Sequence, residues 1–209
     1  MAILHPPFKG GIKGEFRGIS FKLQVFSTRR LFLWYHSPMT DILIKGRSLT
    51  LRTVTPNDTE AILGVYRACE DFLAWGPEPK ASLEMVQKDL EMSRQDGGCF
   101  CGIFNTGGQL AGIIDFVASG FEGKMDIAFF SLIMIAAPFR NQGIGNRTVR
   151  LVEKEIRKNL GITEIRSAVQ VNNAAAIRFW QKNGYRVISG PELQPDSTTV
   201  FRLSKKLGK

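Results

Sequence analysis

The segment Arg140-Asn141-Gln142-Gly143-Ile144-Gly145 joins two contrasting stretches of the chain, and it decides how the fold is interpreted. The run before it, Met125 to Ile135, has the length and apolar character of a buried strand. Apolar residues recur after it at helical spacing, at Val149, Val152, Ile156 and Leu160. A strand-to-helix turn presents successive backbone N–H groups at a helix N-terminus, where the helix dipole also favours an anion. The two glycines let a ligand approach the backbone, so the turn predicts a phosphate site.

Two well-known phosphate loops are excluded by residue detail. A Walker-type loop needs Lys and then Ser or Thr after its last glycine, whereas Gly145 is followed by Asn146 and Arg147. A dinucleotide fingerprint needs a third small residue and a downstream acid, where this chain has Thr148 and Gln170. A purely structural tight turn stays open as the alternative, because a glycine pair is a weak signal.

A second segment adds specificity to the first. Residues Asn173 to Tyr185 read NAAAIRFWQKNGY, which resembles the pattern Asn-x-x-Ala-x-x-Leu/Phe-Tyr-x-x-x-Gly-Phe/Tyr of the GNAT superfamily of acetyl-CoA-dependent N-acetyltransferases. The turn Arg140-x-x-Gly143-x-Gly145 likewise resembles the Arg/Gln-x-x-Gly-x-Gly/Ala motif of that family. The two motifs stand in the family's order, and the resemblance covers about Leu49 to Leu203.

The order of the expected elements agrees with this resemblance. Periodicity and turn residues predict strands at 48–54, 99–104, 109–117, 125–135, 165–169, 185–188 and 199–203. Helices are expected after Thr55, around Leu83 to Leu90, after Gly145 and over Asn173 to Asn183. We therefore predict an α/β (α+β) protein with a GNAT-like acyl-CoA N-acyltransferase fold. Its mixed central sheet has about seven strands flanked by about four helices, and is open between the fourth and fifth strands.

The first residues differ from the rest in charge. The 209-residue chain has a formal net charge of +9, and the segment before Pro38 contains a single acid, Glu15, among the basic residues Lys9, Lys13, Arg17, Lys22, Arg29 and Arg30. We predict a basic N-terminal extension outside the core fold over residues 1–47 and a GNAT-like domain over 48–209. An organellar transit segment, a nucleic-acid-binding arm and an upstream start, with Met39 as the functional one, are the alternatives.

The composition limits which cellular compartment and which classes of partner are expected. Three cysteines form no paired framework, which favours a reducing, cytoplasmic setting. No run approaches the roughly 18 apolar residues of a spanning helix, so no membrane partner is expected. With only His5 and His36 available, no metal is expected. Nucleic acid is not expected either, because no typical binding signature is present; a homodimer stays open.

The resemblance implies a set of residues that bind acetyl-CoA. The backbone of Ile133, Met134 and Ile135 pairs with the pantetheine like an added strand. The pyrophosphate lies against the turn, and Asn173 contacts the cofactor from across the gap. The turn residues implied are Arg140, Asn141, Gln142, Gly143, Ile144 and Gly145.

Direct acetyl transfer needs a neutral amine, a donor for the oxyanion and a route for protons. The resemblance implies the Ile135 N–H as the oxyanion donor. Many family members carry a tyrosine acid where this chain has Trp180, and several carry a glutamate base where Phe129 stands. This leaves Asp115 and Asp126 as the candidate catalytic acids, each of which is also interpretable as an ordinary surface carboxylate.

A nucleophilic cysteine is disfavoured. Cys99 and Cys101 share one strand face and have no histidine within the predicted domain to activate them, so core packing is the better interpretation. By analogy with the family, the acceptor lies near Glu70 to Trp75 and Glu78, where acids beside aromatics suit a cationic amine. A small amine, an antibiotic and a protein or peptide N-terminus all stay open. The competing hypothesis is a catalytically weak or inactive CoA-binding or sensing module.

Overall fold

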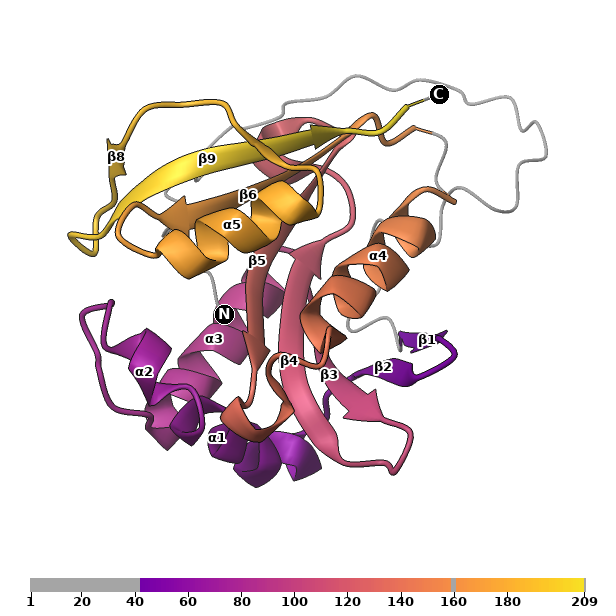
Figure 1. The fold of residues 1–209 in the computed structure, drawn as a ribbon, viewed down its shortest axis with the longest axis vertical. Coiled ribbons are helices and arrows are strands. Elements are labelled where there is room, and N and C mark those ends of the chain that lie inside the picture. The colour runs from indigo at the N-terminus through magenta and orange to yellow at the C-terminus, as the bar shows by residue number, and fades with distance from the viewer. Residues whose placement is uncertain (1–41, 159–160, 209) are drawn as a thin grey trace, which may run out of the picture.

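The computed structural model describes residues 42–158 and 161–208, which form one mixed sheet with helices on both faces (Figure 1). The strand order is β1-β2-β3-β4-β5-β6-β9-β7, and β8 pairs with β9. The strands are β1 (Leu43–Lys45), β2 (Leu49–Thr53), β3 (Cys99–Asn105), β4 (Leu110–Val117), β5 (Ile127–Ile135), β6 (Glu164–Gln170), β7 (Arg186–Val187), β8 (Glu192–Leu193) and β9 (Thr199–Lys206). The helices are α1 (Thr59–Arg67), α2 (Glu70–Leu73), α3 (Leu83–Gln95), α4 (Ile144–Ile156) and α5 (Ala174–Lys182), with short 3₁₀ turns at Pro56–Asp58, Phe121–Gly123 and Ala137–Phe139.

The first helical unit begins as the sequence predicts. The Thr55 backbone N–H donates to Asp58 Oδ2 at 2.7 Å, and the Thr55 hydroxyl donates to the same atom at 2.9 Å. Arg52 on β2 donates two further bonds to this carboxylate, at 2.8 and 2.7 Å. The hydrogen bonds from Arg52 hold the pKa of Asp58 well below its ordinary value. The strand and the start of the helix are thus fixed to each other.

The sheet separates two hydrophobic cores. Helices α1, α2 and α3 cover one face through a core that includes Ile62, Phe72 and Val86. Helices α4 and α5 cover the other face, where Val149 and Trp180 belong to the larger core. The strand at the centre, β5, is buried along its whole length and contributes side chains to both cores. A strand buried on both faces has a nearly continuous apolar sequence, and this one is interrupted at Ser131 alone.

The sheet splits between β5 and β6. The two strands pair in parallel from Ile127 with Glu164 to Phe130 with Ser167, and no further. Ser167 Oγ donates to the Phe130 carbonyl at 2.9 Å, where the pairing ends. On the other side of β5, the register against β4 shifts at Ser131, which is left as a bulged residue. A bulge bends its strand, so β5 turns away from β6 at the point where their pairing ends.

The predicted fold is confirmed, including the opening between the fourth and fifth expected strands, which are β5 and β6. The structure has nine strands and five helices in its described residues, against about seven and four expected. Of the predicted extension, residues 1–41 lie outside the described residues. Its last part contains β1, which pairs with β2 and buries Ile44, so this strand belongs to the sheet. Three residues are too few to produce a recognisable alternation.

The described helices include none with the length and apolar character needed to cross a lipid bilayer.

Candidate active site

The turn between β5 and α4 presents unused backbone donors. Asn141 and Gly143 adopt left-handed conformations, with φ of 61° and 72°. Helix α4 begins without a side-chain cap, and its first backbone bond runs from the Arg147 N–H to the Gly143 carbonyl at 3.1 Å. The N–H groups of residues 141–146 donate no hydrogen bond to any described residue. An anion placed here meets several donors and the positive end of α4.

Close packing explains the second glycine of the turn. A Cβ at Gly145 would lie 3.1 Å from Phe179 Cε2 on α5 and 3.8 Å from Ile135 Cγ1 on β5.

The turn also contains a cationic side chain, because Arg147 Nη1 donates to the Gln142 carbonyl at 2.9 Å. The Gln142 side chain itself bonds back to the Pro138 carbonyl at 3.0 Å. The residues present therefore suit a diphosphate held by backbone amides.

Every second residue of β5 turns its backbone N–H and C=O groups toward the split. The Ala136 N–H donates to the Ala111 carbonyl of the β4 segment, and hydrogen-bonding groups alternate sides along a strand. The backbone groups of Met134 therefore face β4, whereas those of Ile133 and Ile135 face the split. Of the three residues predicted to pair with pantetheine, Ile133 and Ile135 are thus turned toward the gap and Met134 is not.

Arg140 ties the end of β5 to the opposite helical layer. Its Nε donates to the Ile135 carbonyl at 2.9 Å, and its two Nη atoms donate to Asp71 at 2.5 and 2.9 Å. The Cys69 thiol donates to the same Ile135 carbonyl at 3.4 Å. The hydrogen bond from Arg140 lowers the pKa of Asp71. The guanidinium group of Arg140 is thus occupied at the start of α2. The Ile135 carbonyl is also occupied, whereas its N–H faces the split and has no acceptor among residues 42–158 and 161–208.

Asn173 lies at the start of α5, where its side chain caps the helix. Its Oδ1 accepts a hydrogen bond from the Ala176 N–H at 2.9 Å, which makes it the N-cap of the helix. Only 9% of the residue is exposed. Its predicted contact with the cofactor stays a prediction.

The structure separates the two predicted catalytic acids from each other. Asp115 is fully buried on β4, where it pairs with Leu132 of β5 and accepts a hydrogen bond from Ser93 Oγ at 2.7 Å. Asp126 precedes β5, at the opposite end from the turn, and accepts a bond from Thr163 Oγ1 at 2.7 Å. The structure does not bring Asp126 near the split, and the catalytic role of either acid stays a prediction.

Three aromatic residues that the motif comparison singles out are packed in the core. Trp180 is fully buried, with its ring centroid 4.7 Å from that of Tyr185 and 5.6 Å from that of Phe130. The Tyr185 hydroxyl donates to Glu153 at 2.9 Å, and burial raises its pKa well above the ordinary value. Phe129 stacks on Phe121 with centroids 4.0 Å apart. Trp180 and Phe129 thus supply core packing at the two positions where the resemblance implies a tyrosine acid and a glutamate base.

The cysteines of β3 are unsuited to nucleophilic catalysis. Cys101 is fully buried, and Cys99 packs against the same core. Burial raises the pKa of the Cys99 thiol to about 12 and raises that of Cys101 as well. The thiolate is the nucleophilic form, so neither side chain supplies one near neutral pH.

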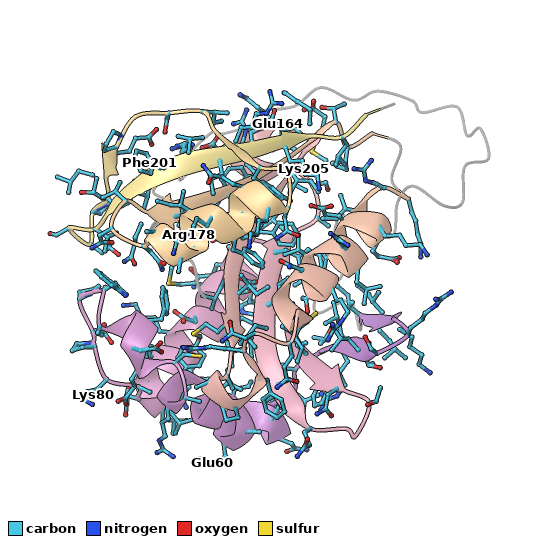
Figure 2. The ribbon with its side chains drawn as sticks, viewed as in Figure 1. Glu60, Lys80, Glu164, Arg178, Phe201 and Lys205 are labelled. Atoms are coloured by element: carbon cyan, nitrogen blue, oxygen red, sulfur yellow. The ribbon has the colours of Figure 1, made fainter. Side chains whose placement is uncertain are left out.

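The acids expected to attract a cationic amine have partners of their own. Glu70 accepts bonds from Lys80 Nζ at 2.8 Å and from the Ala81 N–H at 3.2 Å, and Lys80 lies at the outer edge of the molecule (Figure 2). Glu78 pairs with Lys88 at 3.6 Å, and Asp71 pairs with Arg140 as described above. Trp75, between these acids, is 48% exposed. Recognition of a cationic acceptor by this segment stays a prediction.

Gln170, at the end of β6, is a buried polar residue whose contacts the sequence does not predict. It is 4% exposed, and its Nε2 donates to the Trp75 carbonyl at 3.2 Å. The bond connects the segment between α2 and α3 to the strand beyond the split. The two residues are 95 positions apart, and no local pattern marks such a contact.

Comparisons with known proteins identify the family and the fold. The family model described as "Acetyltransferase (GNAT) family" matches residues 63–185, which is more than half of the chain. No curated protein sequence matches. The fold is similar to that of an acetyltransferase that modifies the N-terminal serine of a 50S ribosomal subunit protein from Salmonella typhimurium, with a TM-score of 0.65, 16% identity, and coverage of 80% of this chain and 100% of that chain.

Two further solved structures share the fold. An acetyltransferase from Thermus thermophilus gives a TM-score of 0.64 at 22% identity, covering 77% of this chain and 97% of that one. The aminoglycoside acetyltransferase AAC(6')-Ib, solved with coenzyme A, gives 0.62 at 17% identity, covering 76% and 95%. The split sheet, the glycine turn and the family match lead to one conclusion: the chain belongs to the GNAT family of acetyltransferases.

Proposed function

We propose that this protein transfers an acetyl group directly from acetyl-CoA to a primary amine. The observation that carries the proposal is the course of one backbone segment. The unpaired edge of β5 at Ile133 and Ile135 leads through Arg140 into a turn whose N–H groups, from 141 to 146, have no acceptor among the described residues. An extended ligand that ends in a diphosphate meets hydrogen-bonding groups along this whole path.

Each part of the path has a role in the proposal. Ile133 and Ile135 add the pantetheine as a strand, in the manner of β-augmentation. Residues Asn141 to Gly145 hold the pyrophosphate at the start of α4. The Ile135 N–H donates to the thioester oxygen as negative charge develops there. Acetyl-CoA supplies the activated acyl group, and the chain supplies binding and orientation.

The acceptor is a primary amine of a small molecule, of an antibiotic or of a protein or peptide N-terminus. Similar folds belong to an enzyme that modifies an N-terminal serine and to one that acts on aminoglycosides. We place the activity in the cytoplasm, because Cys69, Cys99 and Cys101 are all free thiols. The nature of the acceptor is best decided by an amine panel.

The test combines binding and turnover. Calorimetric titration with acetyl-CoA measures affinity, and thiol release with a panel of amines measures transfer. Gly143→Glu places a carboxylate among the turn amides, so we expect at least a 100-fold loss of acetyl-CoA affinity. Gly97→Glu is the matched control, since Gly97 also has a positive φ, 67°, with open space around it, at the end of α3. Unchanged affinity in Gly143→Glu contradicts the site.

A CoA-sensing module is the second candidate. It is favoured by Trp180 and Phe129, because neither side chain ionises and the resemblance implies an ionisable group at both positions. The sensing function predicts tight acetyl-CoA binding without thiol release for any amine between pH 7 and 9. Amine-dependent thiol release at a rate above that of the Gly143→Glu variant excludes it.

A further inference from the structure

One end of the Gln170 side chain lacks a partner. Its Oε1 is buried and accepts no hydrogen bond from any described residue. The bond from Nε2 to the Trp75 carbonyl fixes the orientation of the amide, because a carbonyl oxygen only accepts. The atom that points away from Trp75 is therefore the oxygen. Buried polar atoms are nearly always paired, so this oxygen is available to a donor that arrives with a ligand.

The register of the sheet places this oxygen beside the split. Phe130 pairs with Ser167 at the last position that β5 and β6 share. Gln170 lies three residues beyond Ser167, opposite the part of β5 that follows the Ser131 bulge and has turned away from β6. Within that part of β5, the backbone groups of Ile133 and Ile135 face the gap. Gln170 stays paired to β9 through Val200, so its position is held by the sheet after β5 has turned away.

The side chain also lies on a defined face of the sheet. Successive side chains of a strand alternate between faces, and Gln170 reaches Trp75, which follows α2. Its side chain is therefore on the face covered by α1 to α3. The diphosphate turn opens α4, which covers the opposite face. A cofactor that enters from the α4 side leaves the α1 to α3 side of the gap to the second substrate.

We propose that Gln170 Oε1 accepts a hydrogen bond from an N–H of the attacking amine and so positions the nitrogen lone pair on the thioester carbon. This assignment rests on the proposed acetyltransferase function and deepens it. The carboxylates of the neighbouring segment, Glu70, Asp71 and Glu78, are each in an ion pair. The acceptor that is left, Gln170 Oε1, is neutral and buried. It therefore recognises the amine as its uncharged free base.

The hydrogen bond from the amine to Gln170 Oε1 is kept throughout the transfer. The amine lone pair forms the C–N bond, and the carbonyl oxygen accepts a hydrogen bond from the Ile135 N–H. The C–S bond then breaks, and its electron pair leaves with the CoA sulfur. One N–H proton leaves the nitrogen and the sulfur takes up one proton, while the second N–H stays bonded to Gln170. As positive charge develops on nitrogen, this hydrogen bond becomes stronger.

The test separates an effect on the use of the amine from an effect on the binding of acetyl-CoA. Gln170→Met removes both polar ends at nearly constant volume, and Gln170→Glu keeps an oxygen acceptor while losing the donor to Trp75. Calorimetry measures the acetyl-CoA Kd of each variant. Thiol release at saturating acetyl-CoA gives kcat/KM for the amine. The probe is whichever of phenethylamine, spermidine, kanamycin and a free N-terminal serine peptide the wild type acetylates fastest.

We expect Gln170→Met to keep its acetyl-CoA Kd within about twofold and to lose at least tenfold in kcat/KM for the amine. Gln170→Glu should retain more of this kcat/KM than Gln170→Met. Equal losses in the two variants would assign the effect to the Trp75 bond and overturn the proposal. A tenfold weaker acetyl-CoA Kd with unchanged kcat/KM would assign the oxygen to pantetheine and also overturn it. Failure of the proposed function itself is seen in the wild type, as absent acetyl-CoA binding or absent thiol release.

Discussion

Gly143 shows how a single residue sets the geometry of the turn. Its φ of 72° lies in the left-handed region, where a side chain is crowded by the following carbonyl. The residue also occupies the N-cap position, which Ser, Thr, Asp or Asn would fill with a side-chain acceptor. Because glycine has no such acceptor, the N–H groups of the first turn of α4 stay available to a ligand.

Gly143→Ala should lower the free energy of unfolding by about 1–2 kcal/mol, because a Cβ disfavours the left-handed backbone. The added Cβ would lie 3.2 Å from Arg147 Nη1, the far end of a flexible side chain that is able to move away. Urea denaturation measures the change. The contrasting variant is Gly64→Ala inside α1, where no atom lies within 4 Å; there we expect a gain of about 0.5–1 kcal/mol. Equal changes in both variants would contradict the backbone explanation.

At the scale of elements, the start of α2 and the end of β5 are joined through Arg140. Its guanidinium group reaches the Ile135 carbonyl and the Ala68 carbonyl, at 2.9 and 3.3 Å, as well as the Asp71 carboxylate. The Arg140 side chain is 25% exposed, whereas that of Asp71 is 63% exposed. The bonds to the two carbonyls are therefore the part of this connection that solvent screens least.

Arg140→Met should destabilise the protein by about 1–3 kcal/mol, since it removes one hydrogen bond from each of two carbonyls of low exposure, whose remaining donors are the Cys69 thiol and the Ala137 N–H. Asp71→Asn removes only the exposed half of the ion pair and should cost less than about 1 kcal/mol. Thermal or urea unfolding of the two variants under the same conditions gives the comparison. If Asp71→Asn costs as much as Arg140→Met, the ion pair and not the carbonyl contacts holds these elements together.

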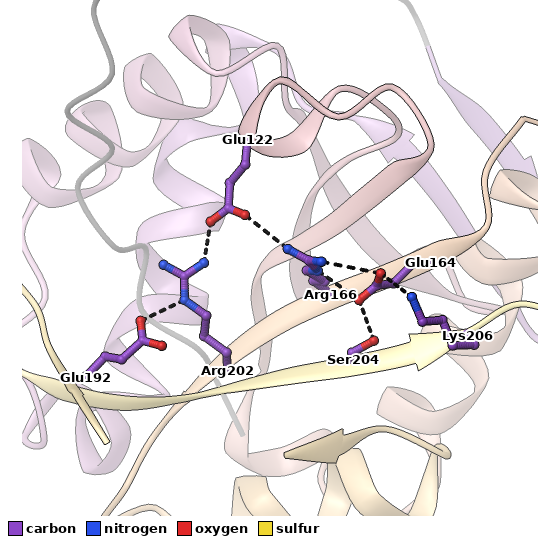
Figure 3. A network of polar contacts seen from close by, with 7 residues as sticks. All are labelled: Glu122, Glu164, Arg166, Glu192, Arg202, Ser204 and Lys206. Atoms are coloured by element: carbon purple, nitrogen blue, oxygen red, sulfur yellow. Dashed lines mark hydrogen bonds and ion pairs between the residues drawn. The ribbon is translucent and has the colours of Figure 1, made fainter. Parts of the chain in front are cut away.

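At the scale of the whole molecule, a charged network fastens the loop before β5 to the C-terminal strands. Arg166 on β6 bonds to Glu122 and Glu164, and Arg202 on β9 bonds to Glu122 and Glu192 (Figure 3). Burial opposes ionisation of Glu164, but hydrogen bonds from Arg166, Lys206 and Ser204 outweigh it and lower its pKa to about 2. The network lies beside the paired part of β5 and β6, so it supports the strands where they are still joined.

This pKa predicts a pH-dependent contribution to stability. A carboxylate with a lowered pKa stabilises the folded state above its ordinary pKa of 4.5, and the contribution disappears as pH falls toward 2. Glu164→Gln should therefore cost up to about 3 kcal/mol at pH 7, and less at pH 3. Urea unfolding at both pH values tests this. Glu192→Gln, at the 36% exposed end of the network, should cost under about 1 kcal/mol; a pH-independent loss in Glu164→Gln would contradict the linkage.

The turn and both motifs could be found in the sequence because their signals are local. Apolar residues of β5, the glycines of 140–145 and the helical spacing of α4 follow one another within about thirty residues, where periodicity is informative. The predicted order of strands and helices was right for the same reason. The short elements β1, α2 and β8 could not be found, because two to four residues do not display a period.

The sequence by itself therefore determined the family, the order of the main elements and the backbone segment proposed to hold acetyl-CoA. Only the tertiary structure decided that Met134 faces β4, that Arg140 is bonded to Asp71 and that Asp126 lies at the far end of β5. It also decided that Gln170 is buried with one end bonded to Trp75. The physical reason is that pairing register, burial and partners arise between residues tens of positions apart, where spacing along the chain carries no information on contact.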